Sequence, residues 1–255
     1  MKMREIGKQV KDADPRFDFG AMDDNRLGME DTFTFDCKAC GECCRDRDDI
    51  LLSPYDVYRS AKCLELEPLE FFKKYCETYI GPSSGIPLIR LLPKPIIKSL
   101  YRVPPKHNTV CPLLQTDGKC KVHKAKPTVC ALFPLGRFTQ TDQKTSKVSL
   151  HYYQQNGKCR ARNNPKTHKV KDWLADFDLS DSEEAFLVWS DFTSYACMEI
   201  QKFKKMSDRI KQLVYNLFFG LAYMNFDLAK GFMPQFKQNI ETFKKLHKEA
   251  VESLH

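Results

Sequence analysis

The last third of the chain repeats apolar residues at the spacing of amphipathic α-helices. Ser180 followed by Glu183 is a capping-box pattern and predicts the start of a helix of about 20 residues. Two further helices are indicated by apolar positions three or four residues apart: Ile210, Leu213, Val214, Leu217 and Leu221 in one, and Phe236, Ile240, Phe243, His247, Ala250 and Leu254 in the other. We expect the three helices to pack against one another as a C-terminal bundle.

The pattern before residue 176 is more broken and predicts short helices and strands. Ser53 and Asp56 hold the N-cap and capping-box positions of a helix that we expect over residues 54–63. A second helix is predicted from Pro68 to the Gly-Pro breaker at residues 81–82. Short strands are predicted within residues 86–92 and 146–154.

Eleven cysteines need an explanation, because a chain of 255 residues can bury a conventional core without cross-links. Seven form a C-x2-C-x2-C-C run and a C-x8-C-x9-C run, and an eighth follows in a turn-like segment. These eight are the predicted metal ligands: Cys37, Cys40, Cys43, Cys44, Cys111, Cys120, Cys130 and Cys159. The other three, Cys63, Cys76 and Cys197, lie in helix-like stretches, where we expect lone cysteines to be small buried hydrophobes.

The spacing of the cysteines favours metal over disulfides. Two thiolates separated by two residues can face one ion when the backbone turns tightly, and Gly41 supplies the freedom in φ. Four cysteines in eight positions cannot easily all reach one ion, so the first run indicates a bridging thiolate, two neighbouring sites or a spectator. The second run contains the turn signal Asp117-Gly118. Joining the runs closes a 66-residue loop at a cost on the order of 4 kcal/mol, against roughly 10–16 kcal/mol for structural zinc.

Charge and hydropathy exclude several classes of protein without identifying a partner. Lys and Arg number 41 and Asp and Glu 33, so the net charge is 41 − 33 = +8, spread along the chain without a nucleic-acid-binding signature. The longest apolar stretch, from Leu217 to Phe226, is far shorter than the roughly 20 residues of a membrane span. The charged N-terminus lacks the apolar segment of a secretory signal, which indicates a cytoplasmic protein, and the odd cysteine count disfavours a set of disulfides.

The order of these motifs resembles a known family. The run FDCKACGECC, followed by ILLSPYDVYR, CPLL, DGKCKVHKAKPTVC and FP, resembles the YkgJ-type CxxCxxCC cysteine-cluster proteins, described as putative zinc- or iron-chelating domains. The resemblance runs from about Phe35 to Cys159 and implies that the clustered cysteines are metal ligands. The chain departs from the family pattern where His123 replaces an aromatic residue and Lys126 an arginine. A relative of the family is flagellin lysine-N-methylase, although this chain has no Gly-rich methyltransferase loop.

Three functions are compatible with the sequence. The first is a metal-binding protein that holds an iron–sulfur cluster ([4Fe–4S]) or zinc in a structural or redox-linked role. The second is a protein lysine methylase that uses S-adenosylmethionine, or another metal-dependent enzyme, in which His123 or Asp46 would be the first candidate for a non-thiolate ligand. No catalytic residue is assigned. The third is an interaction scaffold that docks a protein partner on the C-terminal helices.

We therefore expect a mainly α protein with a few short strands. Residues 1–34 are predicted to form an N-terminal arm, residues 35–175 an irregular, metal-stapled cysteine-cluster domain, and residues 176–255 a C-terminal helical extension.

Overall fold

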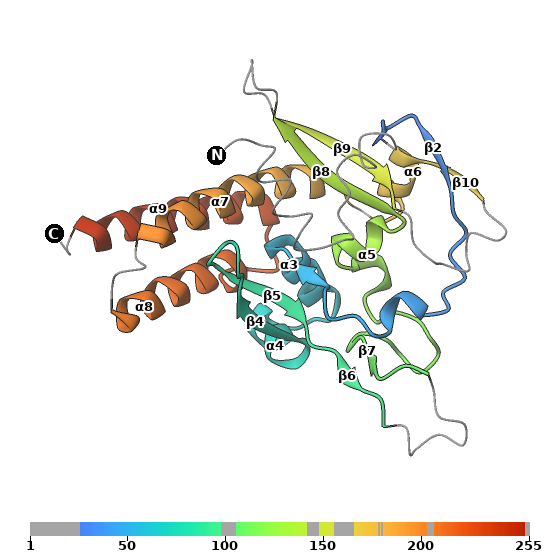
Figure 1. The fold of residues 1–255 in the computed structure, drawn as a ribbon, viewed down its shortest axis with the longest axis horizontal. Coiled ribbons are helices and arrows are strands. Elements are labelled where there is room, and N and C mark those ends of the chain that lie inside the picture. The colour runs from blue at the N-terminus through green and yellow to red at the C-terminus, as the bar shows by residue number, and fades with distance from the viewer. Residues whose placement is uncertain are drawn as a thin grey trace. The chain divides into compact units, whose positions relative to one another are not determined.

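The computed structural model contains two compact units (Figure 1). The residues that it describes are 26–97, 106–141, 148–155, 166–177, 179, 181–202 and 207–252. Helices hold 47% and strands 21% of them, so the class is mixed α/β rather than mainly α. The first unit holds Met1–Lys38 and Leu132–Leu174, and the second holds Ala39–Ala131 and Ala175–His255. The division into an arm, a cysteine-cluster domain and a helical extension stays a prediction.

The first unit is built on two small antiparallel sheets. Strand β9 (Val148–Gln154), as predicted from the sequence, lies between β1 (Arg26–Leu27) and β8 (Leu135–Thr141). The second sheet pairs β2 (Thr32–Thr34) with β10 (Thr167–Lys169). Phe33 packs edge-on against Trp173 of helix α6 (Val170–Ala175), with 5.6 Å between the ring centroids. Within the predicted arm, residues 26–27 and 32–34 are thus strands of this unit, and its part before residue 26 lies outside the described residues.

The second unit contains a three-stranded antiparallel sheet. Its order is β3 (Leu51–Leu52), β5 (Pro87–Leu91) and β4 (Cys76–Ile80), and β5 confirms the strand predicted within residues 86–92. The predicted second helix is too long: helix α4 (Pro68–Tyr75) ends where β4 begins. The aromatic and β-branched side chains of Thr78, Tyr79 and Ile80 favour pairing with β5 over another helical turn.

Helix α3 (Pro54–Cys63) has the bounds and the cap that the sequence predicts. The Ser53 hydroxyl accepts a hydrogen bond from the Asp56 N–H at 3.2 Å, and Asp56 Oδ2 accepts one from the Ser53 N–H at 2.9 Å. This reciprocal capping box satisfies two backbone donors that the first turn of a helix leaves unpaired.

Three C-terminal helices complete the second unit, as predicted. They are α7 (Ser182–Lys202), α8 (Asp208–Phe219) and α9 (Phe232–Glu252), with a π-helical turn (Gly220–Met224) after α8. Their shared core is aromatic: Phe192 stacks on Phe218 with 5.3 Å between centroids, and Phe243 meets Phe218 edge-on at 5.7 Å. The predicted cap residue Ser180 lies outside the described residues.

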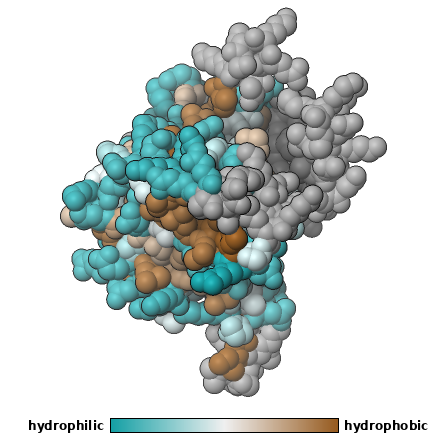
Figure 2. Space-filling view, turned by 90° about the vertical axis from the view of Figure 1, so that its left-hand side faces the viewer, coloured by the Kyte–Doolittle hydropathy of each residue, from teal (hydrophilic) through white to brown (hydrophobic). Residues whose placement is uncertain are grey.

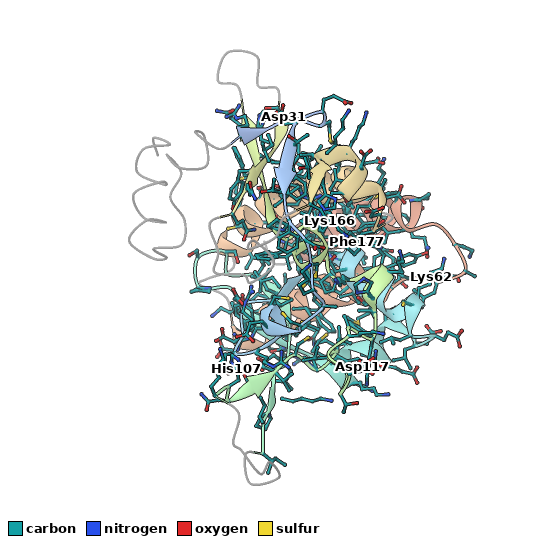
Figure 3. The ribbon with its side chains drawn as sticks, turned by 90° about the vertical axis from the view of Figure 1, so that its right-hand side faces the viewer. Asp31, Lys62, His107, Asp117, Lys166 and Phe177 are labelled. Carbon is teal, nitrogen blue, oxygen red and sulfur yellow. The ribbon has the colours of Figure 1, made fainter. Side chains whose placement is uncertain are left out.

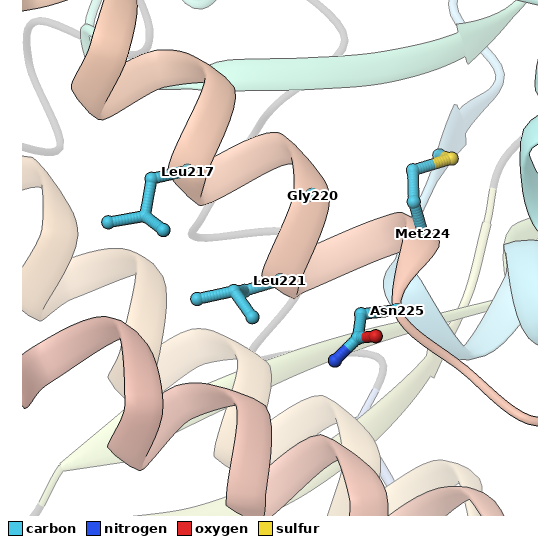
Figure 4. A pocket seen from close by; sticks show the side chains of 5 residues that line it. All are labelled: Leu217, Gly220, Leu221, Met224 and Asn225. Carbon is cyan, nitrogen blue, oxygen red and sulfur yellow. The ribbon is translucent and has the colours of Figure 1, made fainter. Parts of the chain in front are cut away.

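Some apolar side chains of these helices remain exposed, including Met198, Leu213 and Leu246. Figure 2 views the side on which α7, α8 and α9 lie in Figure 1, and it shows apolar residues gathered on that face. An open pocket of about 410 Å³ lies where α8 meets the π-helical turn (Figure 4), and its lining residues are Leu217, Gly220, Leu221, Met224 and Asn225. Among the described helices, none combines the length and the apolar character that crossing a membrane requires.

Candidate metal centre

The first cysteine run lies on a tight turn. Gly41 has a φ of 67°, in the left-handed region that favours glycine, and precedes a single 3-10 turn, η1 (Glu42–Cys44). The Cys44 N–H donates to the Gly41 carbonyl oxygen at 3.1 Å. The Sγ atoms of Cys43 and Cys44 are 4.0 Å apart, so the turn places two thiols side by side.

Backbone pairing brings Cys111 to this turn. Strand β7 (Thr109–Val110) pairs with β6 (Lys94–Pro95), and Val110 also forms an antiparallel bridge with Arg45. One residue further, the Cys111 N–H donates to the Cys44 carbonyl oxygen at 2.8 Å. Main-chain hydrogen bonds therefore join the two cysteine runs, although 66 residues separate them in the sequence.

The carboxylate of Asp46 strengthens this junction. Its Oδ1 accepts from the backbone N–H groups of Thr109 and Asn108 at 2.9 and 2.8 Å, and its Oδ2 lies 2.7 Å from His107 Nδ1. These hydrogen bonds, first those from the two backbone groups, lower the pKa of Asp46 to about 2. His107 Nε2 lies 3.2 Å from Glu42 Oε1, so the imidazole spans both flanks of the Cys43-Cys44 pair. Asp46, considered above as a non-thiolate ligand, already has both oxygens in use.

A hairpin returns the chain from Cys111 to Cys120. Leu114 forms an antiparallel bridge with Cys120, and the Leu114 N–H donates to the Cys111 carbonyl oxygen at 3.0 Å. The predicted turn is present: Gly118 has a φ of 83°, and Asp117 Oδ1 accepts from the backbone N–H that follows Gly118 at 3.0 Å. Turn chemistry that is visible in the sequence thus brings two of the predicted ligands together.

Cys130 lies on a third segment, helix α5 (Thr128–Leu132), which Asp56 anchors. Thr128 donates through its N–H and its hydroxyl to Asp56 Oδ1, each at 2.6 Å. Asp56 Oδ2 accepts from the Ser53 N–H and hydroxyl at 2.9 and 2.8 Å. Asp56 is 3% exposed, so four hydrogen bonds compensate a buried carboxylate. The same side chain that caps α3 therefore positions the segment of Cys130.

Four thiols from these segments influence one another electrostatically, and we call them the thiol quartet: Cys43, Cys111, Cys120 and Cys130. In each of their six pairs, a negative charge on one thiolate raises the pKa of the other. Burial is the largest cause that raises the pKa of Cys111, to about 11, and it also raises the pKa values of Cys120 and Cys130. For Cys43, the hydrogen bond with Cys44 raises the pKa most, followed by burial.

Two cations oppose this repulsion. Lys126 lowers the pKa values of Cys43 and Cys120, and Arg47 lowers that of Cys130. The Arg47 guanidinium is fixed by Asp49, whose carboxylate oxygens accept from Nε at 2.5 Å and from Nη2 at 3.0 Å. Positive charge is therefore already present where thiolates would form.

The other predicted ligands are placed less closely or are not described. Cys44 is half-buried beside Cys43, Cys40 is exposed in the second unit, and Cys37 is exposed in the first. Cys159 lies outside the described residues. Within the described part of the chain, no three His, Cys, Asp or Glu side chains form a group that could hold a metal ion as they stand. The metal staple expected from the sequence is thus not confirmed by the side-chain positions.

A comparison with known protein families matches the part of the chain that contains the clustered cysteines. The model of the CxxCxxCC family, described as "Putative zinc- or iron-chelating domain", matches residues 36–160. This segment, just under half of the chain, is similar to CxxCxxCC domains. It includes all three segments that contribute the thiol quartet, and it supports a metal-binding role. The chain matches no curated protein and no solved structure.

Two cysteines within the matched residues 36–160, both predicted as core residues, lie near the quartet. A charge on Cys63 raises the pKa of Cys120, and a charge on Cys111 raises that of Cys76. Cys76 is buried as predicted, whereas Cys63, the last residue of α3, is exposed. Apolar neighbours in the sequence suggested burial for both, but a residue at a helix end faces inward only if the next segment covers it. Cys197, on α7, is half-buried.

Proposed function

We propose that the thiol quartet binds a metal ion or cluster through Cys43, Cys111, Cys120 and Cys130. The observation behind this proposal is that four thiols from three segments influence one another. Backbone hydrogen bonds pair the cysteine turn with the hairpin, and the Asp56 carboxylate holds the Cys130 segment to α3. The backbones around Cys44, Cys111 and Cys120 are already paired, so side-chain movement is what a shared ion would require of these segments. The match to a chelating family supports the same reading.

The donor set suits a soft metal. Four sulfur ligands without an imidazole or a carboxylate are typical of zinc and of iron–sulfur clusters. A divalent ion with four thiolates has a formal charge of 2 − 4 = −2, which nearby cations and hydrogen bonds must offset. Lys126 and Arg47 are the residues that would do so, since both already favour ionised thiols here. The metal would supply a cross-link between segments distant in the sequence.

We assign the centre a structural role in the cytoplasm, with a redox-linked role if the ligand is an iron–sulfur cluster. The quartet joins the CxxCxxCC turn to the hairpin and to α5, which is the kind of junction a closed four-thiolate site stabilises. Cys37, Cys40, Cys44 and Cys159 remain candidates for a neighbouring site or for a bridging ligand. A reducing compartment would keep all of them free of disulfides.

Metal analysis of the full chain, purified without oxygen, tests this proposal. We expect stoichiometric metal in the wild type and in Cys197→Ser, and its loss in Cys111→Ser and Cys130→Ser. A brown protein that dithionite bleaches identifies an iron–sulfur cluster, whereas a colourless protein with bound zinc identifies zinc. Cys197→Ser is the matched control, because that thiol is also half-buried but lies on α7. Full metal content in Cys130→Ser, or equal loss in all three variants, would refute the quartet.

A further inference from the structure

A basic cluster lies in the second unit around the half-buried ring of Phe177. We call it the Phe177 cluster, and its members are Arg59, His123, Lys124, Lys126 and Phe177. The Lys126 Nζ lies 5.2 Å from the Phe177 ring centroid, and the His123 ring lies 6.0 Å from it, centroid to centroid. Figure 3 labels Phe177 together with Lys62, a residue of α3, the helix that also carries Arg59.

Arg59 is the buried part of this cluster and has a donor without an acceptor. Arg59 is only 8% exposed, and its Nη2 donates to the carbonyl oxygens of Lys124 and Phe177 at 3.0 and 2.5 Å. Among the described residues, its buried Nη1 has no hydrogen-bond partner. The guanidinium carbon also lies 5.3 Å from the centroid of Tyr55. Because arginine keeps its charge, an unpaired buried guanidinium N–H indicates an anionic acceptor that binds there.

The cations around Arg59 also lack carboxylate partners. Across the residues that the structure describes, neither Lys124 nor Lys126 forms an ion pair with a carboxylate, and the Lys126 Nζ instead lies over the Phe177 ring. Their repulsion is visible at His123, whose pKa is lowered first by burial and then by Lys126, Lys124 and Lys119. Lys124 and His123 are exposed, so solvent reaches the outer part of the cluster.

We propose that the Phe177 cluster binds the phosphate group of a small phosphate monoester or of free phosphate. Arg59 Nη1 supplies the buried donor, Lys124 and Lys126 supply charge at the rim, and the Phe177 ring offers an apolar surface for an ester group. Three permanent cations match a dianion better than a singly charged carboxylate. Guanidinium N–H groups also fit the oxygen geometry of phosphate. This site uses none of the quartet's thiols, although Lys126 also influences Cys43 and Cys120, and it goes beyond the proposed metal function.

Calorimetric titration of the full chain at low ionic strength tests the proposal, with inorganic phosphate and phenyl phosphate as probes. We expect saturable binding of one equivalent. Tighter binding of phenyl phosphate assigns the site to monoesters, because its ring would pack on Phe177, and equal or weaker binding assigns it to free phosphate. Lys126→Gln should weaken binding by roughly two- to fivefold, as expected for an exposed charge pair. Arg59→Lys should weaken it by more than about tenfold, since one point charge replaces a fixed donor fork.

The control variant is Lys248→Gln, which removes an exposed lysine of α9 that lies 3.8 Å from Glu252 and far along the chain from the cluster. Its affinity should equal that of the wild type. The absence of saturable binding to the wild type overturns the proposal, and so does an equal weakening by Lys126→Gln and Lys248→Gln, which would reveal general attraction to a basic protein. Titration of Cys130→Ser separates the two sites, because phosphate binding should persist when the metal is lost.

Discussion

Replacing Asp56 with asparagine should destabilise the second unit by about 2–4 kcal/mol. The carboxylate faces four donors, two of them backbone N–H groups at the starts of α3 and α5. Asparagine keeps the shape but offers one oxygen, so its amide NH2 must face either the Ser53 or the Thr128 backbone N–H. Hydroxyl groups can rotate away from the amide, whereas the backbone N–H cannot. One buried backbone donor is therefore left unpaired at about 1–3 kcal/mol, and the remaining bonds lose the charge of their acceptor.

Urea unfolding of the full chain measures this loss. With a slope of a few kcal/mol per molar, the expected midpoint shift is roughly 1 M. Asp208→Asn is the matched control, since this aspartate also lies in the first turn of a helix, α8, but its side chain is fully exposed. Because Thr128 leads directly to Cys130, Asp56→Asn should also release metal more readily than Asp208→Asn does. Equal midpoints for the two variants would show that the carboxylate does not anchor α5, and the reasoning about the site would fail with it.

Two further substitutions test the packing and the cysteine turn. Phe218 is fully buried and stacks on Phe192, so Phe218→Ala should lower the free energy of unfolding by about 3–5 kcal/mol in the same assay. Leu213 lies on the same helix but is 61% exposed, so Leu213→Ala should change it by less than about 0.5 kcal/mol. Similar costs for the two variants would contradict the assigned core. Gly41 has a φ of 67°, so Gly41→Ala should lower the free energy of unfolding by about 1–2 kcal/mol and should weaken metal binding. Gly220 has a helical φ and open space where a Cβ would lie, so Gly220→Ala should be neutral or stabilising. Equal effects of the two glycine variants would argue that the cysteine turn does not require a left-handed residue at position 41.

Local signals in the sequence predict those elements whose stabilising contacts are also local. Ser53 and Asp56 lie three residues apart and cap the same helix, so α3 could be located to the residue. The hairpin between Cys111 and Cys120 is specified in the same way by its Asp-Gly turn. The three C-terminal helices follow from the apolar spacing, because one stripe of each helix faces a shared core.

Elements that depend on distant partners could not be predicted. Strand β1 exists because Arg26 and Leu27 pair with Tyr153 and Tyr152, and no pattern within two residues announces that pairing. The sequence predicts a helix where β4 lies, because the pairing of Cys76 with Leu91 depends on β5, a distant segment. Tertiary pairing therefore determined these segments, and their propensity alone did not.

The site shows the same contrast between motif and packing. Cysteine spacing identified the candidate ligands but left open which of them lie together, because a run of four thiols fits one site, two sites or a bridge. The answer depends on backbone contacts such as that between Cys111 and Cys44, which join segments 66 residues apart. The unpaired Nη1 of Arg59 had no signal in the sequence, since burial of its donor requires the carbonyl groups of Lys124 and Phe177.

The backbone contacts around the thiol quartet also bear on what a bound metal does for this fold. In small zinc-dependent domains the metal orders an otherwise unfolded chain, so nearly all of its binding free energy becomes folding free energy. Here the quartet belongs to a unit with an aromatic core of its own, and Asp56 and the pairing of Cys111 with Cys44 hold the ligand segments through protein groups alone. Less ordering entropy then remains for the metal to offset when it binds. A metal bound by the quartet would therefore add to the stability of a preformed fold through ligand linkage rather than create that fold.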